Sequence, residues 1–453
     1  MTTSHYQDGC PTGSKERGNA AVWVVNFNNG NVNNNHRNNN ACVRAVRAGE
    51  YHGEEAVSLR ELHDAWRTAR AGKKPSQNQL AFDAHWAEGL LHLQRRLNSG
   101  SWQPGRSACF VATRPKAREI HAPDFADRVV HHWLVPQLEK LWEPAFIFDS
   151  YANRKGKGSH AAVQRLQQFV RQVHSGQRGG RYLQLDIHNF FNSIHRPTLW
   201  AILKKKLQRA PVSDQVMRTT HALLRRPPLQ AGVIYHGTAQ ERALVPPHKR
   251  LENARPGCGL PIGNLSSQFL ANVYLDRLDQ FVKHTLKAKR YLRYVDDFVL
   301  VHRDRQQLAT WQQQIETFIA QALQLRLKAD IRLRPLADGI DFLGYIVRPS
   351  HTLVRRRVVA HARSALAEWG SKHLSGGKLQ ATPAQFRAIQ SIAASYAGHL
   401  RHADSNRLQR SLINQFPWLP SATRKRTFDY RLEGTTITVP TRQQRTTPTG
   451  GTA

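Results

Sequence analysis

The 453-residue chain has few acidic residues, few cysteines, two methionines and no long apolar run. Because no run approaches the roughly 20 apolar residues of a membrane-spanning helix, and the N-terminus is too polar for a signal peptide, we expect a cytoplasmic protein without a membrane segment. Its cysteines, Cys10, Cys42, Cys109 and Cys258, show neither CxxC spacing nor a nearby histidine pair. This spacing predicts neither a zinc site nor a disulfide framework.

Basic residues outnumber acidic residues by two to one. The chain has 66 Lys and Arg against 32 Asp and Glu, which gives a formal net charge of +34. Such a surface attracts polyanions, and each phosphate that it neutralises releases condensed counterions. Nucleic acid is therefore the expected partner. The alternative is a basic protein that binds anions only loosely.

Apolar periodicity separates helical from strand-like stretches between two irregular ends. The first 50 residues and the last thirty are rich in small and polar residues, so we expect both ends to be disordered. Residues 259–282 resemble a turn followed by an amphipathic helix. The other helical patterns cover residues 58–70, 82–97, 127–142, 161–173 and 360–415. The strand-like patterns cover residues 109–123, 181–191 and 290–302.

Two of the strand-like stretches contain aspartate, which is unfavourable because desolvating an uncompensated charge costs free energy. Asp186 lies in LQLDIHNFF, and Asp296 and Asp297 lie side by side in YLRYVDDFVL. Adjacent strand residues point to opposite faces, so a hairpin turn would be needed for both to reach Asp186. Three carboxylates that converge on two Mg²⁺ ions can support in-line phosphoryl transfer. The alternative is a surface hairpin in which the two aspartates only favour the turn.

The sequence YVDD between apolar residues resembles the YxDD box of reverse transcriptases. Supporting motifs stand in the order of that family over residues 105–415: RPKAREIHAP, FADRVVHH, DSYANRKGKGSHAA, LDIHNFFNSI, GLPIGNLSSQFLANVYLD and FLGY. More narrowly, IGNLSSQ resembles the IGxxxSQ variant of reverse transcriptases from diversity-generating retroelements, where most relatives carry QGxxxSP. Group II intron and retron enzymes share much of the remaining pattern.

The resemblance implies a metal site and a contact with the leaving group. Asp186, Asp296 and Asp297 would be the metal ligands, with the carbonyl of Ile187 as a further contact. Lys328 in LRLKADIRLRP matches, in an unclear register, a lysine that assists the departing pyrophosphate in this family.

Further residues take positions that contact the incoming nucleotide or the template base in this family: Lys116, Arg118, Phe191, Ile262, Gly263 and Gln268. The two cations would bind the triphosphate, unless they belong to the solvated surface. Phe191 would collide with a ribose 2′-OH and so select dNTPs, with core packing as the alternative. Gly263 and Gln268 would shape the floor under the template base.

Two more features follow from the resemblance. The FLGY motif would hold the primer end through Phe342, Leu343 and Gly344. Ile262 stands where relatives outside the subgroup carry Gln, and it offers no hydrogen bond near the incoming nucleotide. That loss would loosen fidelity, although packing beneath the fingers is the alternative reason for an isoleucine.

Residues 26–40 read NFNNGNVNNNHRNNN. Diversity-generating retroelements copy a template repeat with errors opposite adenine, and the adenine-rich codons AAC and AAT both encode Asn. Residues 20–47 look like such a repeat translated in frame, which would matter as RNA and not as protein. An ordinary polar arm is the alternative. Because the only methionines are Met1 and Met217, and a start at Met217 would delete Asp186, a shorter enzyme would begin at a non-ATG codon.

The resemblance implies an α+β, right-hand polymerase fold. It would comprise a disordered segment over residues 1–50, fingers and palm over 51–345, a helical thumb over 346–420 and a basic flexible tail over 421–453. The implied function is that of an Mg²⁺-dependent RNA-directed DNA polymerase, bacterial or phage-encoded. Its partners would be template-repeat RNA, cDNA, dNTPs and a small basic helical oligomeric accessory protein. A group II intron, retron or phage-defence enzyme, or a catalytically idle RNA-binding protein of the same fold, is the alternative.

Overall fold

The computed structural model describes residues 24–25, 32–33, 56–72, 74–113, 116–175, 179–423 and 436–440. The chain divides into two compact units, residues 1–54 and 55–453. In the first unit, β1 (Val24–Val25) pairs antiparallel with β2 (Val32–Asn33). This short hairpin lies in the segment that was predicted to be disordered, and its β-branched valines favour strand pairing. The rest of residues 1–50 lies outside the described residues.

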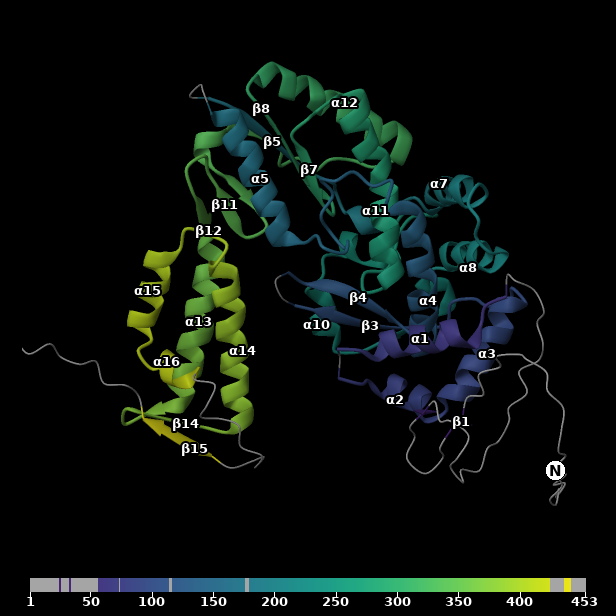
Figure 1. Cartoon of the computed structure of the whole chain (residues 1–453), viewed down its shortest axis with the longest axis horizontal. Coiled ribbons are helices and arrows are strands. Elements are labelled where there is room, and N and C mark those ends of the chain that lie inside the picture. Colours follow the sequence, from purple (N-terminus) through teal and green to yellow (C-terminus); the bar gives the residue numbers. More distant parts are fainter. Residues whose placement is uncertain are drawn as a thin grey trace, which may run out of the picture. The chain divides into compact units, whose positions relative to one another are not determined.

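The palm sheet of the second unit is antiparallel, with the strand order β7-β8-β5-β9; Figure 1 labels its strands β7, β8 and β5. Side chains of β5 alternate between two cores, Leu183 and Leu185 in one and Tyr182 in the other. α12 (Arg305–Leu323) contributes to the first core and α5 (Ser159–His174) to the second. The strands are therefore buried on both faces, which explains their almost continuous apolar sequence. Their bounds are β5 (Arg181–Asp186), β7 (Tyr291–Tyr294), β8 (Asp297–His302) and β9 (Arg332–Pro335).

Helix α11 (Leu265–Gln280) is a central helix, and eleven of its sixteen residues are buried. It contacts α4 (Phe125–Trp142), α7 (Arg196–Leu207) and α12. The prediction of an amphipathic helix was wrong here, because helices cover it on several sides and leave little solvent face. A π-helical turn, Phe281–Thr285, extends it.

The helical patterns of residues 58–70 and 82–97 form three helices: α1 (Leu59–Arg70), α2 (Gln77–Ala84) and α3 (Trp86–Asn98). Ser58 caps α1, because its hydroxyl accepts from the Glu61 N–H while the Glu61 carboxylate accepts from the Ser58 N–H. The continuous pattern expected from Phe82 onward is interrupted at His85, whose backbone is not helical. Directly after the break, Trp86 begins α3 and stacks on Trp66 of α1, with ring centroids 5.0 Å apart.

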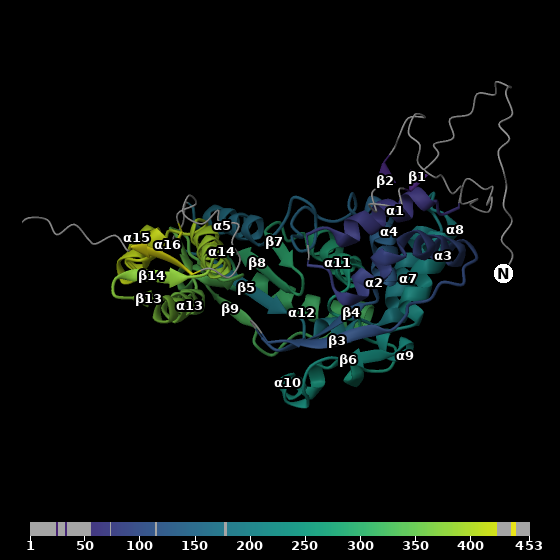
Figure 2. The same ribbon diagram turned by 90° about the horizontal axis from the view of Figure 1, so that it is seen from below.

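A second sheet has the strand order β4-β3-β6; its first two strands precede the palm strands in sequence, and β6 follows β5. β3 (Ser107–Ala112) and β4 (Arg118–Pro123) form an antiparallel hairpin, and β6 (Val233–Tyr235) pairs in parallel with β3 (Figure 2). We call β3 and β4 the fingers hairpin. Short helices of this region are α6 (Phe190–Ser193), α8 (Asp214–Arg225), α9 (Pro228–Ala231), α10 (Ala239–Ala243), η1 (Pro247–Lys249) and η2 (Leu251–Asn253).

The C-terminal part begins with a three-stranded sheet and continues as a helical bundle (Figure 1). The helices predicted over residues 360–415 are confirmed except at residues 374–381, where two short strands interrupt them. Its first elements are η4 (Leu336–Asp338), β10 (Ile340–Phe342), β11 (Tyr345–Val347) and β12 (Thr352–Val354). The bundle contains α13 (Arg356–His373), α14 (Pro383–Leu400), α15 (Asn406–Gln415) and α16 (Leu419–Ala422).

One strand lies in the segment that was predicted to be a flexible tail. β15 (Ile437–Pro440) pairs with β14 (Lys378–Ala381), which itself pairs with β13 (Leu374–Ser375). Val439 is buried in the bundle core, so the prediction was wrong for these residues. The α+β class is confirmed, and no helix within the described ranges is long and apolar enough to cross a membrane.

Candidate active site

The ends of the palm strands bring the three predicted carboxylates together. Asp186 of β5 lies directly opposite Asp297 of β8, and directly opposite residues of an antiparallel pair share one face of the sheet. Asp296 lies in the turn between β7 and β8, beside Val295 with a φ of 56°. The hairpin turn predicted at the aspartate pair is confirmed.

Burial and mutual repulsion raise the pKa values of two of these carboxyls. Burial raises the pKa of Asp297 to about 7, and the charges of Asp186 and Asp296 add to this rise. The hydrogen bond from Gln184 acts in the opposite direction and lowers the pKa. Burial, followed by the charge of Asp186, raises the pKa of Asp296 to about 6. Gln184 Nε2 donates to Asp297 Oδ1 at 3.1 Å and to Asp341 O at 3.0 Å.

These carboxylates fit a hard divalent cation. Neighbouring like charges disfavour ionisation unless a positive charge compensates them. Asp186 Oδ1 is buried and has no hydrogen-bond partner among the described residues. Mg²⁺ prefers carboxylate oxygens, and the donor set of the hairpin consists of such oxygens.

Lys328 supplies a positive charge at the same place. Its ammonium group forms an ion pair with the Asp186 carboxylate, and its backbone N–H donates to Asp186 O at 2.8 Å. His188 N–H donates to Arg326 O at 2.8 Å, so a β-bridge joins Ile187 to Leu327. The two hydrogen bonds of this bridge use the His188 N–H and the Asp186 carbonyl, so the Ile187 carbonyl takes no part in the bridge.

A cleft beside the hairpin collects residues that are far apart in the sequence. The predicted site residues that line it are Lys116, Arg118, Phe191, Ile262, Gly263, Gln268, Asp296, Asp297, Lys328 and Leu343. Asp186, Ile187, Phe342 and Gly344 are not among its lining residues within the described ranges. Phe342 is fully buried in the core, so of FLGY's predicted primer-end residues only Leu343 faces the cleft.

The loop with Ile262 and Gly263 is attached to the fingers hairpin. His121 N–H of β4 donates to Ile262 O at 2.7 Å. Gly263 has a φ of 120°, and a Cβ at this position would lie 2.8 Å from Ile120 Cγ2 and 2.9 Å from His121 O. Only glycine fits this backbone conformation and this close approach.

The two phenylalanines after β5 have different surroundings. Phe190 is buried, at 3% exposure, whereas Phe191 is half-buried, and their ring centroids are 5.4 Å apart. Both contribute to the cleft lining. The more accessible ring belongs to Phe191, for which the sequence analysis predicted a contact with the nucleotide.

The sequence analysis missed Arg293, which supports the hairpin from within the core. This side chain is 1% exposed and pairs with the fully buried Asp279 at 2.6 Å. It also donates to Asn272 Oδ1 at 3.2 Å, to Ser150 Oγ at 3.2 Å and to the turn carbonyl Val295 O at 2.9 Å. A charged residue in an apolar strand was the available signal, as it was for Asp186.

Other cleft residues also lay outside the predicted set, namely Lys249, Asn153 and Asn189. Asn153 and Asn189 have φ values of 53° and 47°, which asparagine tolerates better than most residues. Asn189 Nδ2 donates to His248 O at 2.6 Å, so the loop that carries Lys249 is attached to the end of β5. No periodic pattern marks these loop positions.

The FLGY turn connects β10 with β11 and meets the bundle. Leu343 has a φ of 50° and Gly344 a φ of 90°. Tyr345 stacks on His399 of α14 with ring centroids 4.2 Å apart, and its hydroxyl donates to His399 O at 2.8 Å. Arg355 N–H donates to Gly344 O at 2.9 Å. The turn is therefore attached to the residue that precedes α13 and to α14.

An antiparallel sheet with carboxylates at one hairpin, a fingers hairpin that contributes Arg118 to the same cleft, and a helical bundle attached to the FLGY turn define a polymerase of right-hand architecture. Within that class, the chain belongs to the family described as reverse transcriptase (RNA-dependent DNA polymerase), which matches residues 112–347, slightly more than half of the chain.

Two curated relatives are similar at low identity. Protein YkfC of Escherichia coli K12 is 23% identical over 316 residues, which cover 62% of this chain and 75% of YkfC. The group II intron-encoded protein LtrA of Lactococcus lactis subsp. cremoris is 21% identical over 337 residues, which cover 59% of this chain and 51% of LtrA. The chain thus spans about half the length of LtrA. Among solved structures, apo telomerase from Candida tropicalis, truncated from the C-terminal domain, matches with a TM-score of 0.41 and 10% identity over 55% of each chain.

Proposed function

We propose that the chain is an Mg²⁺-dependent RNA-directed DNA polymerase that copies a template-repeat RNA into cDNA with errors at adenine, as part of a diversity-generating retroelement. The observation that supports the chemistry is the convergence of Asp186, Asp296 and Asp297 beside a cleft whose lining includes Lys116 and Arg118. The narrower assignment rests on the IGNLSSQ motif around Ile262.

In this proposal the primer 3′ oxygen forms a bond to the α-phosphorus of a dNTP while the bond to pyrophosphate breaks. Asp186, Asp296, Asp297 and the Ile187 carbonyl would hold Mg²⁺, which when bound would lower the pKa of the primer hydroxyl and offset charge on the pyrophosphate. Lys328 adds a cation beside Asp186.

Binding of the substrates would fall to the other cleft residues. Lys116 and Arg118 would bind the triphosphate through charge-assisted hydrogen bonds, and Phe191 would exclude a ribose 2′-OH. Gly263 and Gln268 would lie under the template base. The FLGY turn, through Phe342, Leu343 and Gly344, would support the primer end.

A group II intron enzyme is the second candidate, because LtrA carries that name and is 21% identical over 59% of this chain. Both candidates share the polymerase chemistry, and they differ in copying accuracy at adenine. In the assay below, a retron or phage-defence enzyme is expected to give the same result as a group II intron enzyme, which is extension without an excess of errors opposite adenine.

Primer extension on an RNA template containing all four bases, followed by sequencing of the cDNA, separates these functions. We expect extension with dNTPs and Mg²⁺ and an excess of errors opposite adenine. Extension without that excess would favour the intron or retron class. Absence of extension, with RNA binding retained, would leave a catalytically idle RNA-binding protein. The assay is run with and without the proposed small basic accessory protein.

The asparagine-rich segment enters the proposal as translated template repeat. Except for Val32 and Asn33, residues 26–40 lie outside the described residues. Deleting residues 2–50, with the template RNA supplied separately, is expected to leave polymerase activity within about twofold, because the segment lacks a pattern for a core. A soluble but inactive truncated protein would give the segment a role as protein. A near-repeat of codons 20–47 in the flanking DNA would support its role as RNA. The proposed location is the cytoplasm, for a protein that is bacterial or phage-encoded.

A further inference from the structure

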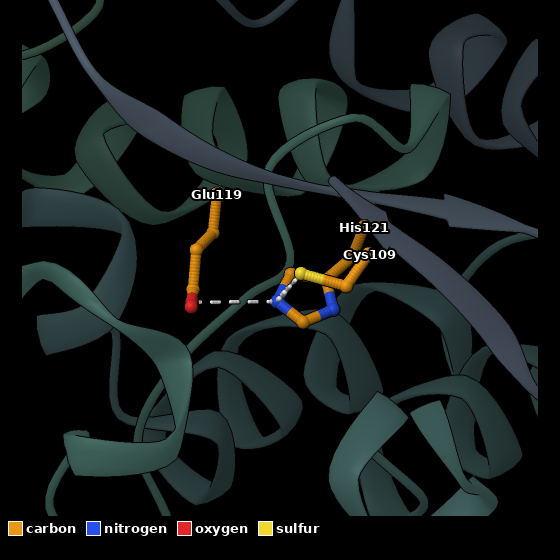
Figure 3. Close-up of side chains that lie close together, drawn as sticks. All are labelled: Cys109, Glu119 and His121. Carbon is orange, nitrogen blue, oxygen red and sulfur yellow. Dashed lines mark hydrogen bonds and ion pairs between the residues drawn. The ribbon is translucent and has the colours of Figure 1, made fainter. Parts of the chain in front are cut away.

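We propose that the fingers hairpin holds a zinc ion between Cys109, Glu119 and His121. Cys109 of β3 lies directly opposite His121 of β4, and Glu119 precedes His121 by two residues on the same face. The three side chains are 2%, 6% and 2% exposed. They point toward one another from the two strands (Figure 3). The sequence analysis missed this group because its members meet across a hairpin and not within a CxxC motif.

The donor atoms are close to the spacing that zinc requires. Cys109 Sγ lies 3.9 Å from His121 Nε2, and His121 Nε2 lies 3.8 Å from Glu119 Oε2. All three donor atoms lie within 4.8 Å of one another. Zinc–ligand bonds of about 2.0–2.3 Å place tetrahedral ligand atoms roughly 3.3–3.7 Å apart. Side-chain rotations that draw the donors together by up to about an ångström would therefore close the site.

The chemistry of the donors favours zinc over magnesium. A thiolate and an imidazole are softer ligands than the oxygens of the palm site, and zinc binds such sets with a carboxylate as a third ligand. Thiolate and carboxylate together would balance the charge of Zn²⁺. Water would take the fourth position, since the described residues offer three donors here.

Neighbouring groups orient the carboxylate of Glu119. Leu251 N–H donates to Glu119 Oε2 at 3.0 Å, and Arg242 Nε lies 3.6 Å from Glu119 Oε1. Within the described ranges, His121 Nε2, the nitrogen that would bind the metal, has only long contacts, 3.8 Å to Glu119 Oε2 and 3.9 Å to Cys109 Sγ, and the contact with Glu119 is longer than a normal hydrogen bond.

Binding would exchange a proton for the metal. Burial and then the charge of Glu119 raise the pKa of the Cys109 thiol to about 11, so the sulfur carries a proton at neutral pH in the absence of metal. The S–H bond breaks, an S–Zn bond forms, and the proton passes to the buffer.

The ion would stabilise one wall of the cleft. The same His121 whose ring would bind zinc donates its backbone N–H to Ile262 O, and β4 begins at Arg118. Removal of zinc is therefore expected to raise the KM for dNTP several-fold with a smaller effect on kcat. This consequence rests on the proposed polymerase function, whereas zinc binding does not.

The test uses full-length protein, stripped of metal and titrated with Co²⁺ and then Zn²⁺. Wild type is expected to bind Co²⁺ with a thiolate-to-cobalt charge-transfer band that Zn²⁺ removes, a signal that the oxygen ligands of the palm cannot produce. Cys109→Ser is expected to lose the band and to lower zinc affinity by roughly tenfold or more. Cys258→Ser is the matched control, because Cys258 is the other buried free cysteine of the described residues, and it is expected to behave as wild type.

Absence of the band in wild type, or a band of full intensity in Cys109→Ser, would overturn the proposal. Circular dichroism checks the fold of each variant. If Cys109→Ser does not fold, Glu119→Gln replaces it: this change is expected to keep the band while weakening zinc binding, and unchanged affinity would count against the site. A protein that binds zinc through Cys109 but never extends a primer would refute the polymerase and leave the zinc site standing.

Discussion

The YVDD hairpin and the FLGY turn each contain a non-glycine residue in the left-handed conformation, Val295 at φ 56° and Leu343 at φ 50°. The contacts that stabilise this conformation differ between the two turns. The Val295 carbonyl accepts from Arg293, whose guanidinium is almost fully buried. The FLGY turn is held by Arg355, whose side chain is 48% exposed and pairs with Asp341 at 3.0 Å, and by contacts with the bundle.

Because different contacts stabilise the two turns, we expect the turns to behave differently when the primer binds. A left-handed β-branched residue costs on the order of 1–3 kcal/mol and persists only where its surroundings enforce it. At the hairpin, the hydrogen bond to the Val295 carbonyl comes from Arg293, which lies within the palm. At FLGY the contacts reach His399 of α14, so the turn is expected to move with the thumb as the primer binds.

Among the changes that test this comparison of the two turns, Arg293→Lys is expected to have the largest effect. Lysine keeps the charge but cannot reproduce the forked contacts of the guanidinium, and weakening a buried ion pair lowers the free energy of unfolding by about 2–4 kcal/mol. The rate of single-nucleotide addition is expected to fall more than about tenfold, because misplaced catalytic groups reduce rate steeply. Urea unfolding and single-turnover kinetics measure both quantities.

Arg303→Lys is the control for this change. Arg303 follows β8 and donates to the carbonyls of Val173 and Ser175 from a more exposed position. Its replacement is expected to change stability by less than about 1 kcal/mol. Equal losses in both variants would mean that the buried position of Arg293 has no special role.

Gly344→Ala is expected to have the next largest effect, on primer binding. Gly344 has a φ of 90°, and an added Cβ would lie 3.1 Å from His399 Cε1. The strain of about 1–3 kcal/mol is expected to raise the KM for primer–template several-fold with a smaller change in kcat. In Gly398→Ala, the control on α14, the added Cβ meets no described atom within 4 Å. A loss in kcat alone for Gly344→Ala would contradict the assignment of this turn to primer binding.

The charge at the hairpin predicts a pH dependence of stability. The pKa of Asp297 is raised to about 7 in the folded protein, so between roughly pH 4 and pH 7 the folded state binds more protons than the unfolded state. Stability in EDTA therefore falls as pH rises through this window. Asp297→Asn removes the cost of ionising this buried carboxyl. It is therefore expected to stabilise the metal-free protein at pH 8 by on the order of 1–2 kcal/mol.

The difference between Asp297→Asn and wild type is expected to vanish near pH 4, where both side chains are neutral. Mg²⁺ is expected to raise the melting temperature of wild type at pH 8 more than that of the variant. Melting curves at the two pH values, with and without Mg²⁺, measure this. A variant that is less stable than wild type at pH 8 in EDTA would show that the carboxylates do not repel one another.

Ile262→Gln is expected to have the smallest effect, on fidelity. A restored hydrogen bond of roughly 0.5–1.5 kcal/mol corresponds to about three- to twelve-fold in discrimination. Errors opposite template adenine are expected to fall more than errors opposite the other bases, with a modest loss of rate. cDNA sequencing compares the variant with wild type and with Ile234→Gln, which changes an exposed isoleucine of β6. Equal adenine errors would assign Ile262 to packing.

Site residues that stand out singly in an apolar stretch could be predicted from the sequence. Residues whose role depends on a partner far away in the chain could not. Asp186, Asp296 and Asp297 were recognised because each is a charge in an apolar stretch. Arg293 carries the same signal, but its meaning depends on Asp279, a partner on α11 that no periodic pattern connects to it.

Interruptions and long-range pairings were also beyond the sequence pattern. The break at His85 lies within a continuous helical period, and β15 is a four-residue strand whose partner β14 lies about sixty residues earlier in the chain. Cys109 and His121 meet because strand pairing places them opposite each other. In each case the determining contact comes from the fold and not from the spacing of residue types.

A comparison of Asp186→Asn and Asp296→Asn with wild type in primer extension on RNA tests the proposed polymerase site. Each change removes one negative ligand from a site whose catalysis is electrostatic, so synthesis is expected to fall by more than about a hundredfold. RNA affinity is expected to remain within about twofold, because these carboxylates do not contribute to phosphate binding. Asp338→Asn, at an exposed position of η4, is expected to match wild type. Extension by either active-site variant at close to the parent rate would contradict the assignment.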